Sequence, residues 1–459
     1  MNKITVIKNF KVIPYLYGIS FTPMKTFQSL SEKFGDVVSL KFWNESVYFV
    51  NDPIIIQYIL KTNYSNFPRS NSILDLKPLL GKGLFISEDE LWQSQRKLLT
   101  PAFHNSSLEN FYTVLDKELN VISKKLDNFA EQNNSIDLEH ELKILLLNMT
   151  IKNMLSTDIL FDADSLLKSL SQILTHTQNK WHNLRLVLSF FRKDQLRLFD
   201  FRKNKIALKV ITNFTDKTVQ DAFASKINPA GLLLILLEAY KSKSIDEQQI
   251  KDEIQTILFA GYDTVAEGIL WLIYFLSRDK ALMNKVMAEI SEKESNDHSA
   301  RISMSDTAFL TSCIKETLRL MPPAWSFYRT VKDDTTFNEI TFPKRALIMI
   351  SPYILHRNKK YWKNAEIFDP SRFLDDNPTD PFHYIPFGHG PHICIGNRLA
   401  MIEIHAVAYY LLKNYEFTFE SPNISIPSLF PSAIISSKEK IAVKVKRRLT
   451  MKKNIDLQN

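Results

Sequence analysis

Cysteine and linker-like segments are scarce in this sequence. The two cysteines, Cys313 and Cys394, lie far apart and have no CxxC partner or zinc-finger spacing, which argues against a disulfide scaffold and a structural zinc site. No Gly/Ser-rich or Pro-rich linker divides the chain, and there are no internal repeats. We therefore expect a single domain over residues 1–459, with residues 1–30 as an N-terminal lead-in and 446–459 as a basic tail.

The N-terminal segment also lacks a long apolar run. Its uncharged stretch, residues 12–24, is interrupted by two prolines and a glycine and falls short of the about 20 apolar residues that cross a bilayer. No continuous apolar core leads to a small-residue cleavage site of a secretory signal. We therefore expect a cytoplasmic protein without a membrane span.

Charge and aromatic patterning exclude nucleic acid as a partner. Basic and aromatic residues are not interleaved in the manner that stacks bases. The formal net charge of +8 lies partly in the C-terminal tail, which favours acidic partners in a diffuse way. With 459 residues, 45% of them hydrophobic and 24% charged, the chain has an ordinary globular composition and can bury a large core.

Hydrophobic periodicity predicts a mainly α protein with minor β structure. Residues 35–60 alternate as strands do before a short helix, and the region after Pro322 breaks into strand-like pieces, the last at 440–448. Most of the middle is helical. Residues 246–278 contain no proline and become apolar nearly all round, which predicts one continuous helix through the core.

The interior of that helix holds groups that a buried helix normally avoids. Gly261 costs about 1 kcal/mol relative to alanine, and the Asp263 carboxylate costs more unless it is paired. The Thr264 hydroxyl can bond to the Ala260 carbonyl four residues back and bend the helix. Either these groups are a tolerated glycine and a satisfied core threonine, or a small ligand presses against the backbone at this point.

A glycine-rich loop at 387–396 surrounds Cys394 and precedes a helical pattern. Backbone amides and the positive end of a following helix can stabilise a thiolate that binds iron. Gly388 and Gly390 would let the loop turn, and Gly396 would let a flat cofactor lie against the backbone. Taken alone, the loop fits an inert buried cysteine in a tight turn at least as well.

Together these motifs resemble those of the cytochrome P450 family. The loop resembles the family's haem-binding loop, whose positions are occupied here by Phe387, Gly390, His392, Cys394 and Gly396. The segment "AGYDT" is similar to the family's oxygen-binding helix. The motifs "WQSQR", "KETLRL" and "FDPSRF" supply the remaining signature residues Trp92, Arg96, Glu316, Arg319 and Arg372. The motifs follow the family's order from about residue 35 to the tail.

The resemblance implies a helix-rich lobe and a small β-sheet lobe around a buried haem b. Cys394 would bind the iron, and Ala260 and Gly261 would lie against the cofactor. The haem propionates would be held by Trp92, Arg96, Arg329 and His392. Arg329 could instead be an ordinary arginine at a strand end. A buried structural clamp behind the loop would be formed by Glu316, Arg319 and Arg372.

The implied activity is that of a monooxygenase, which inserts one atom of dioxygen into a hydrophobic small molecule. Hydroxylation of a lipid, fatty acid or terpenoid-like compound is the default. Thr264 would bond to the dioxygen and Asp263 would help to relay protons. Electrons from NAD(P)H would come through a separate ferredoxin- or flavodoxin-type protein, and a basic face that includes Arg398 would suit an acidic donor.

Several finer points stay open in the sequence. A peroxide-driven or rearranging haem-thiolate enzyme, or a haem-thiolate sensor or carrier, would keep Cys394 without needing the acid and threonine pair. The family commonly has arginine where His392 stands, and histidine indicates a soluble, bacterial-type member. The roof of the substrate pocket is expected at 70–87 and 180–203, whose mixed basic and apolar residues would also allow peripheral membrane contact.

Overall fold

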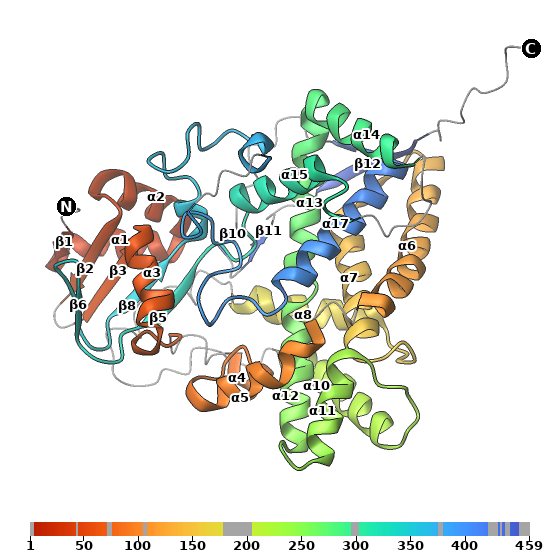
Figure 1. The fold of residues 1–459 in the computed structure, drawn as a ribbon, viewed down its shortest axis with the longest axis horizontal. Helices are drawn as coiled ribbons and strands as arrows, with labels where there is room; N and C mark the ends of the chain where they lie inside the picture. Colours follow the sequence, from red (N-terminus) through yellow and green to blue (C-terminus); the bar gives the residue numbers. More distant parts are fainter. Residues whose placement is uncertain are drawn as a thin grey trace, which may run out of the picture.

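A computed structural model gives the fold and describes residues 4–42, 45–70, 76–103, 108–177, 204–294, 303–374, 380–420, 430–431, 434–436 and 441–448. The largest sheet lies on one side of the molecule together with the N-terminus, and most long helices lie on the other side, where β12 (Ala442–Arg447) is also found (Figure 1). The predicted helix-rich fold with a small β component is confirmed. The predicted roof segment at 180–203 and most of the basic tail lie outside the described residues.

The largest described sheet has the strand order β1-β2-β3-β8-β5. Its strands are β1 (Thr5–Lys8), β2 (Val37–Phe42), β3 (Glu45–Val50), β8 (Leu347–Ile350) and β5 (Phe327–Thr330). β2 and β3 pair in antiparallel register, whereas β3 and β8 are parallel. The middle of β2 and β3 is buried on both faces. The strand prediction for this region is confirmed, and the sheet is sandwiched between other elements.

The N-terminal segment is part of the fold rather than a lead-in. β1 pairs in parallel with β2 and is followed by α1 (Ile13–Phe21) and α2 (Pro23–Phe34). The apolar residues of α2 repeat at helical spacing, and Phe27 and Leu30 are buried in the cluster beneath the sheet. Burial of this apolar face explains why the segment is integrated into the domain.

Three smaller sheets complete the β structure of the described residues. Their strands are β4 (Ser135–Asp137), β12 (Ala442–Arg447) and β9 (Tyr415–Phe419), then β6 (Thr335–Phe337) and β7 (Ile340–Phe342), then β10 (Phe430–Pro431) and β11 (Ile435–Ser436). In β12, Val443 and Val445 are buried while Lys444 and Lys446 are exposed. The alternation read from the sequence is thus that of a strand with one face on the core.

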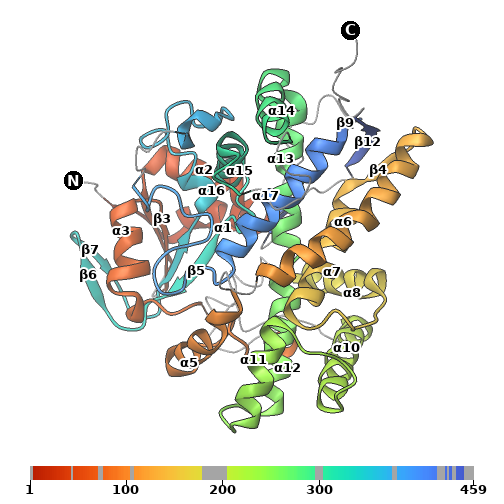
Figure 2. The ribbon, with the colours of Figure 1, turned by 45° about the vertical axis from the view of Figure 1, so that its right-hand side comes forward.

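Helices make up most of the described chain. They are α3 (Pro53–Gln57), α4 (Lys77–Leu80), α5 (Asp89–Leu99), α6 (Leu108–Glu131), α7 (Leu138–Met154), α8 (Ala163–Thr177), α10 (Lys205–Phe223), α11 (Gly231–Lys241), α12 (Glu247–Ala260), α13 (Asp263–Arg278), α14 (Lys280–Glu294), α15 (Ala308–Leu320), α16 (Pro352–Leu355) and α17 (Asn397–Asn414). α13 lies at the centre and packs against α7, α15 and α17. Figure 2 shows α17 crossing beside α13 on its way from the Cys394 loop.

The predicted continuous helix is interrupted between α12 and α13. The helical pattern stops at Ala260 and resumes at Asp263. The Thr264 hydroxyl donates to the Ala260 carbonyl, and the Thr150 hydroxyl of α7 donates to the Gly261 carbonyl. Side chains therefore bond to two carbonyls at the break, which explains the bend.

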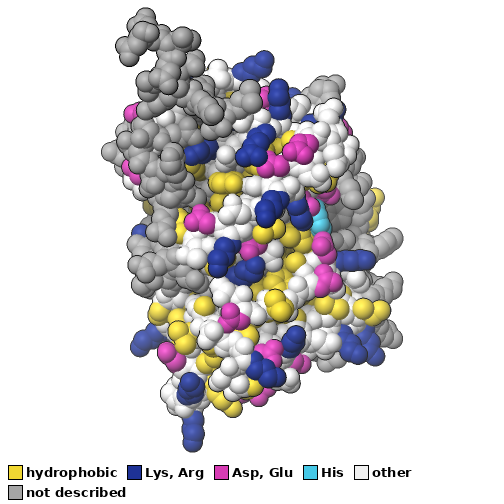
Figure 3. Space-filling view, turned by 90° about the vertical axis from the view of Figure 1, so that its right-hand side faces the viewer, with side chains coloured by type: hydrophobic (Ala, Val, Ile, Leu, Met, Phe, Trp, Pro, Cys, Tyr) yellow, Lys and Arg dark blue, Asp and Glu magenta, His cyan; other side chains and the backbone are white. Residues whose placement is uncertain are grey.

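Residues 247–278 are long and apolar enough by composition to cross a membrane, but 78% of their most apolar window is buried inside the protein. That burial is typical of a core helix. On the helix-rich end of the molecule, basic and acidic side chains are interspersed, with apolar atoms between them (Figure 3). The positive net charge is therefore not gathered into one patch on this face.

Candidate haem site

The loop around Cys394 has a backbone that only glycine accommodates at position 390. Gly388 and Gly390 have φ values of +71° and +75°, which side chains rarely adopt. A Cβ on Gly390 would also lie 1.8 Å from the Leu60 carbonyl oxygen. The Cys394 amide donates to the Phe387 carbonyl at 3.0 Å and closes the loop. This bond and the constrained backbone at Gly388 and Gly390 fix the position of the sulfur.

The surroundings of Cys394 can stabilise a thiolate. Burial raises the pKa of its thiol, while the Gly396 amide and the Arg96 guanidinium lower it. Gly396 is the N-cap of α17, so the positive end of that helix lies beside the sulfur. Cys394 is nevertheless exposed, whereas Cys313 is fully buried and its thiol pKa is raised mainly by burial. Of the two cysteines, only Cys394 is open to a ligand.

Gly396 has no packing reason to be glycine within the described protein. A Cβ there would meet the Phe103 ring at 3.7 Å or more, which is ordinary contact, and its φ of −90° suits any residue. This contrasts with Gly390, where the backbone of Leu60 leaves no room. The prediction that a flat cofactor lies over Gly396 remains a prediction.

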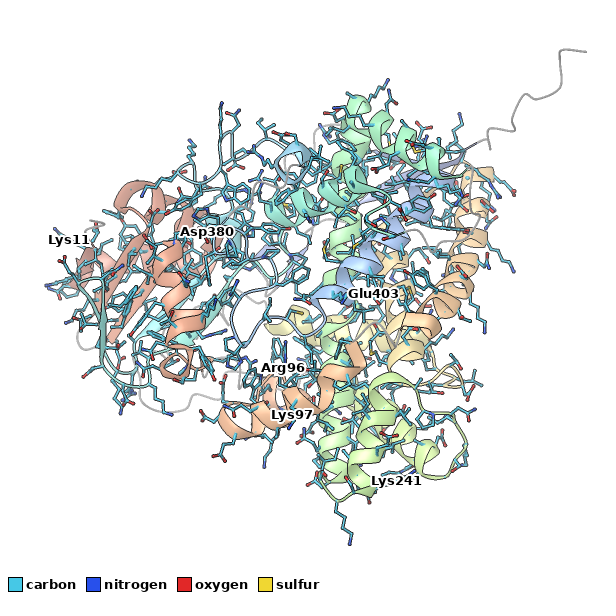
Figure 4. All side chains as sticks on the ribbon, in the orientation of Figure 1. Lys11, Arg96, Lys97, Lys241, Asp380 and Glu403 are labelled. Atoms are coloured by element: carbon cyan, nitrogen blue, oxygen red, sulfur yellow. The ribbon has the colours of Figure 1, made fainter. Side chains whose placement is uncertain are left out.

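Two of the expected propionate donors come from α5. Figure 4 places Arg96 on this helix, at the junction between the strand side and the central helices. Its Nη1 donates to the Ile393 carbonyl at 2.8 Å, which ties α5 to the cysteine loop. The ring of Trp92, one turn earlier, lies 3.9 Å from the ring of His392 between centroids. The spacing of the "WQSQR" motif thus puts both residues against the loop.

Arg329 and a residue that the sequence reasoning missed, Arg69, join this group. Arg329 projects from β5 and is 9% exposed, and its backbone bridges to that of Arg69. Burial and, next, the charge of Arg69 lower the pKa of Arg329 to about 10. Arg69 pairs with Glu88 at 3.5 Å. Arg69 lies outside every motif, so only the strand bridge that links it to Arg329 reveals it.

The charges of this group do not balance within the protein. Glu88 and Arg96 influence the pKa of Arg69, and Arg69 and Glu88 influence the pKa of Arg329, so three guanidinium groups and a single carboxylate form one connected group. Together with these arginines, burial lowers the pKa of His392 to about 3, so His392 is neutral. Two positive charges are left over in a largely enclosed site. A ligand with two carboxylates, such as haem with its two propionates, would compensate them.

Two buried nitrogens in the same place also lack a partner. Among the described residues, Trp92 Nε1 and His392 Nδ1 make no hydrogen bond, although an unsatisfied buried donor costs about 1–3 kcal/mol. Both can donate to a propionate oxygen. The cationic excess, the two free nitrogens and the accessible cysteine therefore fit a thiolate-ligated haem.

At the break in the central helix, Gly261 faces α7 rather than an open space. A Cβ on Gly261 would lie 2.9 Å from the Thr150 side chain, so helix packing accounts for this glycine. The expectation that a ligand also lies against Gly261 remains a prediction. Ala260, Gly261 and Thr264 are half-buried and therefore partly accessible, whereas Tyr262 and Asp263 are buried.

Asp263 lies in a charge cluster that was not predicted. Its Oδ1 is 2.7 Å from the ammonium nitrogen of Lys143 in α7. The same nitrogen is 2.6 Å from Glu139 Oε1 and 3.4 Å from Glu267 Oε1. The buried carboxylate that the sequence singled out is therefore paired. Its partner belongs to another helix, and no local pattern connects the two in sequence.

The three expected clamp residues meet in the interior. Arg319 forms a two-pronged pair with Glu316, with both N···O distances at 2.7 Å and both side chains fully buried. Arg372 Nε approaches the same carboxylate at 3.4 Å. The remaining guanidinium bonds of Arg319 go to the carbonyls of His356, Ala365 and Ile367. Glu316 and Arg319 thus form a buried, hydrogen-bonded pair rather than a surface ion pair, and Arg372 Nε lies near their carboxylate without a hydrogen bond among the described residues.

His356 connects the clamp to the cysteine loop and was also missed. One ring nitrogen contacts the Arg319 carbonyl at 3.1 Å, and the Ile385 amide donates to the other at 2.9 Å. Burial, the first cause, lowers the pKa of His356 to about 3, which keeps the ring neutral and able to accept. The clamp thus fixes the backbone from which the Cys394 loop departs.

Comparisons with known proteins agree with this geometry. The family model described as Cytochrome P450 matches residues 9–445. The chain is 27% identical over 425 residues to "Cytochrome P450 4A10" of Rattus norvegicus, covering 88% of this chain and 82% of the relative. It is 28% identical over 402 residues to "Cytochrome P450 4F12" of Homo sapiens, covering 80% and 74%. "Probable cytochrome P450 4ac2" of Drosophila melanogaster is 29% identical over 361 residues, covering 74% and 69%.

These relatives come from animals, so the expectation of a soluble, bacterial-type member is not borne out. The match spans nearly the whole chain and includes every motif that the sequence offered. The family implies haem b, dioxygen, a hydrophobic substrate and electrons delivered from NAD(P)H through a redox partner. The chain belongs to the cytochrome P450 family and is a haem-thiolate monooxygenase.

Proposed function

We propose that this monooxygenase hydroxylates a lipid-like substrate and that Cys394 is the residue that would bind the iron of haem b. The observation that carries the proposal is an accessible cysteine in a constrained loop beside a group of three arginines with two uncompensated positive charges. Thiolate-bound haem supplies cleavage of the bond between two oxygen atoms and transfer of one of them to a C–H group. The propionates would be held by Arg69, Trp92, Arg96, Arg329 and His392.

The described part of the predicted roof supports an apolar substrate. Its Gly81 and Gly83 lie so close to α12 that a Cβ would meet Asp252 and Thr256 within 2.1 Å. The Phe85 ring, partly exposed, lies 5.4 Å from the ring of Phe259, the residue before Ala260. Aromatic side chains next to the helix break suit an alkyl chain or a terpenoid skeleton rather than a charged group.

We assign proton handling to Thr264 and Asp263. The Thr264 hydroxyl donates to the Ala260 carbonyl at 3.1 Å, and its oxygen can still accept a hydrogen bond from a second group. Asp263 is the adjacent carboxylate and is held by Lys143. General acid–base groups of this kind contribute about 10²–10⁴-fold to rate.

The test is the variant Thr264→Ala. We expect it to consume NAD(P)H at near the normal rate while yielding about tenfold less hydroxylated product, because proton delivery is lost. Thr212→Ala is the matched control, since the Thr212 hydroxyl also bonds four residues back, to the Leu208 carbonyl in α10. Unchanged coupling in Thr264→Ala would instead favour a peroxide-driven or rearranging enzyme or a haem-thiolate sensor.

We also propose that an acidic ferredoxin- or flavodoxin-type donor docks beside α5 and the start of α17. Both elements reach the Cys394 loop and carry exposed cations, Lys97 and Arg398. The double variant Lys97→Glu, Arg398→Glu should slow reduction by such a donor and weaken its salt dependence. Lys241→Glu, at the far end of α11 (Figure 4), is the control. Equal reduction rates for both variants would refute this docking face.

Finally, we propose that the N-terminal face contacts membranes peripherally. Phe10, Ile13 and Tyr17 are 79%, 48% and 63% exposed beside the cations Lys8 and Lys11. Apolar rings flanked by lysines suit an anionic lipid surface. Phe10→Glu should reduce sedimentation with vesicles that contain phosphatidylserine, whereas Leu160→Glu, at an 87% exposed site between α7 and α8, should not. Equal vesicle binding by both variants would refute a membrane contact at this face.

A further inference from the structure

The charge cluster around Lys143 contains more carboxylates than its single ammonium can neutralise. Glu139 and Lys143 stand one turn apart on α7, and Asp263 and Glu267 one turn apart on α13. Lys143 Nζ lies 2.6, 2.7 and 3.4 Å from oxygens of Glu139, Asp263 and Glu267. If all three acids were ionised, the buried cluster would keep two uncompensated negative charges, which is costly away from water.

Burial decides which acid carries a proton. The Glu267 side chain is 0% exposed, compared with 9% for Asp263 and 17% for Glu139, and it is also the farthest of the three from the ammonium. Burial and then the carboxylates of Glu139 and Asp263 raise the pKa of Glu267 well above its usual range, although Lys143 opposes this. Glu267 is therefore the neutral acid of the cluster.

No other charged group competes for this proton. Lys143 and Glu139 face Glu267 from α7, and Asp263 is the charged neighbour on its own helix. α15 and α17 also pack against α13, and among their described residues none forms an ion pair with Glu267. The Tyr262 phenol also lies within the influence of Asp263 and Lys143, but burial raises its pKa, so it stays neutral and the charged groups are three acids and one base.

The cluster runs from the protein surface to the break in the central helix. Lys143 and Glu139, at 14% and 17% exposure, form its outer end, and Glu267 forms its buried end. Asp263 and Thr264 precede Glu267 by four and three residues, so all three share one side of adjoining helical turns. A proton taken up at the rim can thus reach the residues to which proton handling was assigned above.

From this arrangement we propose that Glu267 is the proton store of the enzyme, filled through Glu139 and Lys143 and discharged to Asp263. This rests on the proposed role of Asp263 and Thr264. Inserting one oxygen atom into a C–H bond and releasing the other as water consumes two electrons and two protons. Each proton leaves Glu267 for the Asp263 carboxylate, and Glu267 regains one from water at the rim. Lys143 is a positioning residue that keeps the acids together.

The first test measures the stored proton itself and needs neither turnover nor bound haem. Infrared difference spectra of wild type minus Glu267→Gln at pH 7 should show the carbonyl stretch of a protonated carboxylic acid, which shifts in heavy water. Glu403→Gln is the matched control, because Glu403 is a buried glutamate of α17 that forms no ion pair with the residues that the structure describes; it should remove a separate band. Absence of the Glu267 band would overturn the proposal.

The second test measures proton flow. Glu267→Gln should lower the yield of product per NAD(P)H about tenfold and raise the solvent deuterium isotope effect on turnover, and Glu267→Asp should restore part of both. Glu139→Gln, at the partly exposed rim, should give the same isotope effect while leaving the Glu267 band in place. If the band is present but Glu267→Gln keeps normal coupling and isotope effect, the acid is structural and the proposal fails.

The two tests separate this proposal from the proposed function. The infrared band can be measured even in a protein that hydroxylates no substrate, so its presence or absence does not depend on the proposed function. A protein with the band and with coupled turnover that is insensitive to both Glu267→Gln and Glu139→Gln would keep its assigned function and lose only the proton store.

Discussion

Two buried charge groups of this protein are unbalanced in opposite directions. Beside the cysteine loop, Arg69, Arg96 and Arg329 face one carboxylate, that of Glu88. Between α7 and α13, three carboxylates face one ammonium, that of Lys143. A cationic excess cannot be relieved by losing protons at neutral pH, because guanidinium groups stay protonated, so it requires an anionic ligand. An anionic excess can be relieved by taking up a proton.

The difference teaches how to tell a binding site from a proton site. The pair of Glu316 and Arg319 within the clamp provides the reference, because its two charges cancel and its hydrogen bonds are made within the protein itself. Its role follows as structural. The arginine group lacks anions and the lysine group lacks cations, and each therefore points to something that comes from outside the chain.

The largest effect is expected from removing one partner of the buried pair of Glu316 and Arg319. Arg319→Met leaves the fully buried Glu316 without its main partner, and removing one member of a buried pair costs about 3–5 kcal/mol of unfolding free energy. Urea unfolding measures the loss. Lys344→Met is the control, since the pair of Lys344 and Asp333 is more than 60% exposed and contributes under about 1 kcal/mol. Similar losses in the two variants would contradict the distinction.

A smaller effect is expected for Glu403, a buried acid that forms no ion pair with the described residues. Burial raises the pKa of Glu403 from 4.5 to about 8, so the folded state holds a proton that the unfolded chain releases. Its stabilisation is fully present below pH 4.5 and is lost as the pH rises through about 8. With about 1.4 kcal/mol for each pKa unit, the loss is a few kcal/mol.

Glu403→Gln should remove that part of the pH dependence of unfolding, because an amide does not titrate. The measurement is the free energy of unfolding at a series of pH values between 4.5 and 8. Parallel curves for the variant and the wild type would show that Glu403 is already ionised in the folded protein. In that case burial alone would not hold a proton in this interior, and the account of Glu267 would need its neighbouring carboxylates as the main cause.

The smallest effect is expected in the arginine group beside the cysteine loop. Arg329→Met should weaken haem retention about 10- to 100-fold, as expected for one charge-assisted hydrogen bond of about 1.5–3 kcal/mol. The haem-free protein should become more stable, because the repulsion between Arg329 and Arg69 disappears. Haem transfer to a competing apoprotein and thermal unfolding measure the two changes. Loss of stability in both forms would mean that Arg329 serves folding rather than the cofactor.

Much of the fold and of the site could be predicted from local sequence patterns. Helices, strands and the loop glycines follow from periodicity and from steric demands such as those at Gly390. The clamp could be anticipated because Glu316 and Arg319 are three residues apart on one helix face. The bend near Gly261 was foreseen through Thr264, whereas the complete interruption depends on Thr150 from a different helix.

The features that were missed depend on contacts between distant segments. Arg69 is recognisable only through its bridge to β5, and His356 only through its contacts with Arg319 and Ile385. Lys143 sits among other charged residues of α7 and gives no local sign that it faces Asp263. Residues 1–30 were expected to be an N-terminal lead-in, because their role as a strand and a packed helix becomes visible only through the pairing of β1 with β2.

The central claim is that the Cys394 sulfur binds the haem iron, and one spectrum tests it most directly. The protein is reconstituted with haem, reduced and exposed to carbon monoxide, and its absorption is compared with that of Cys394→Ser. The account predicts the long-wavelength Soret band of thiolate-ligated haem in the wild type and its absence in the variant. A wild-type band at the position typical of nitrogen-ligated haem, or an unchanged band in Cys394→Ser, would contradict it.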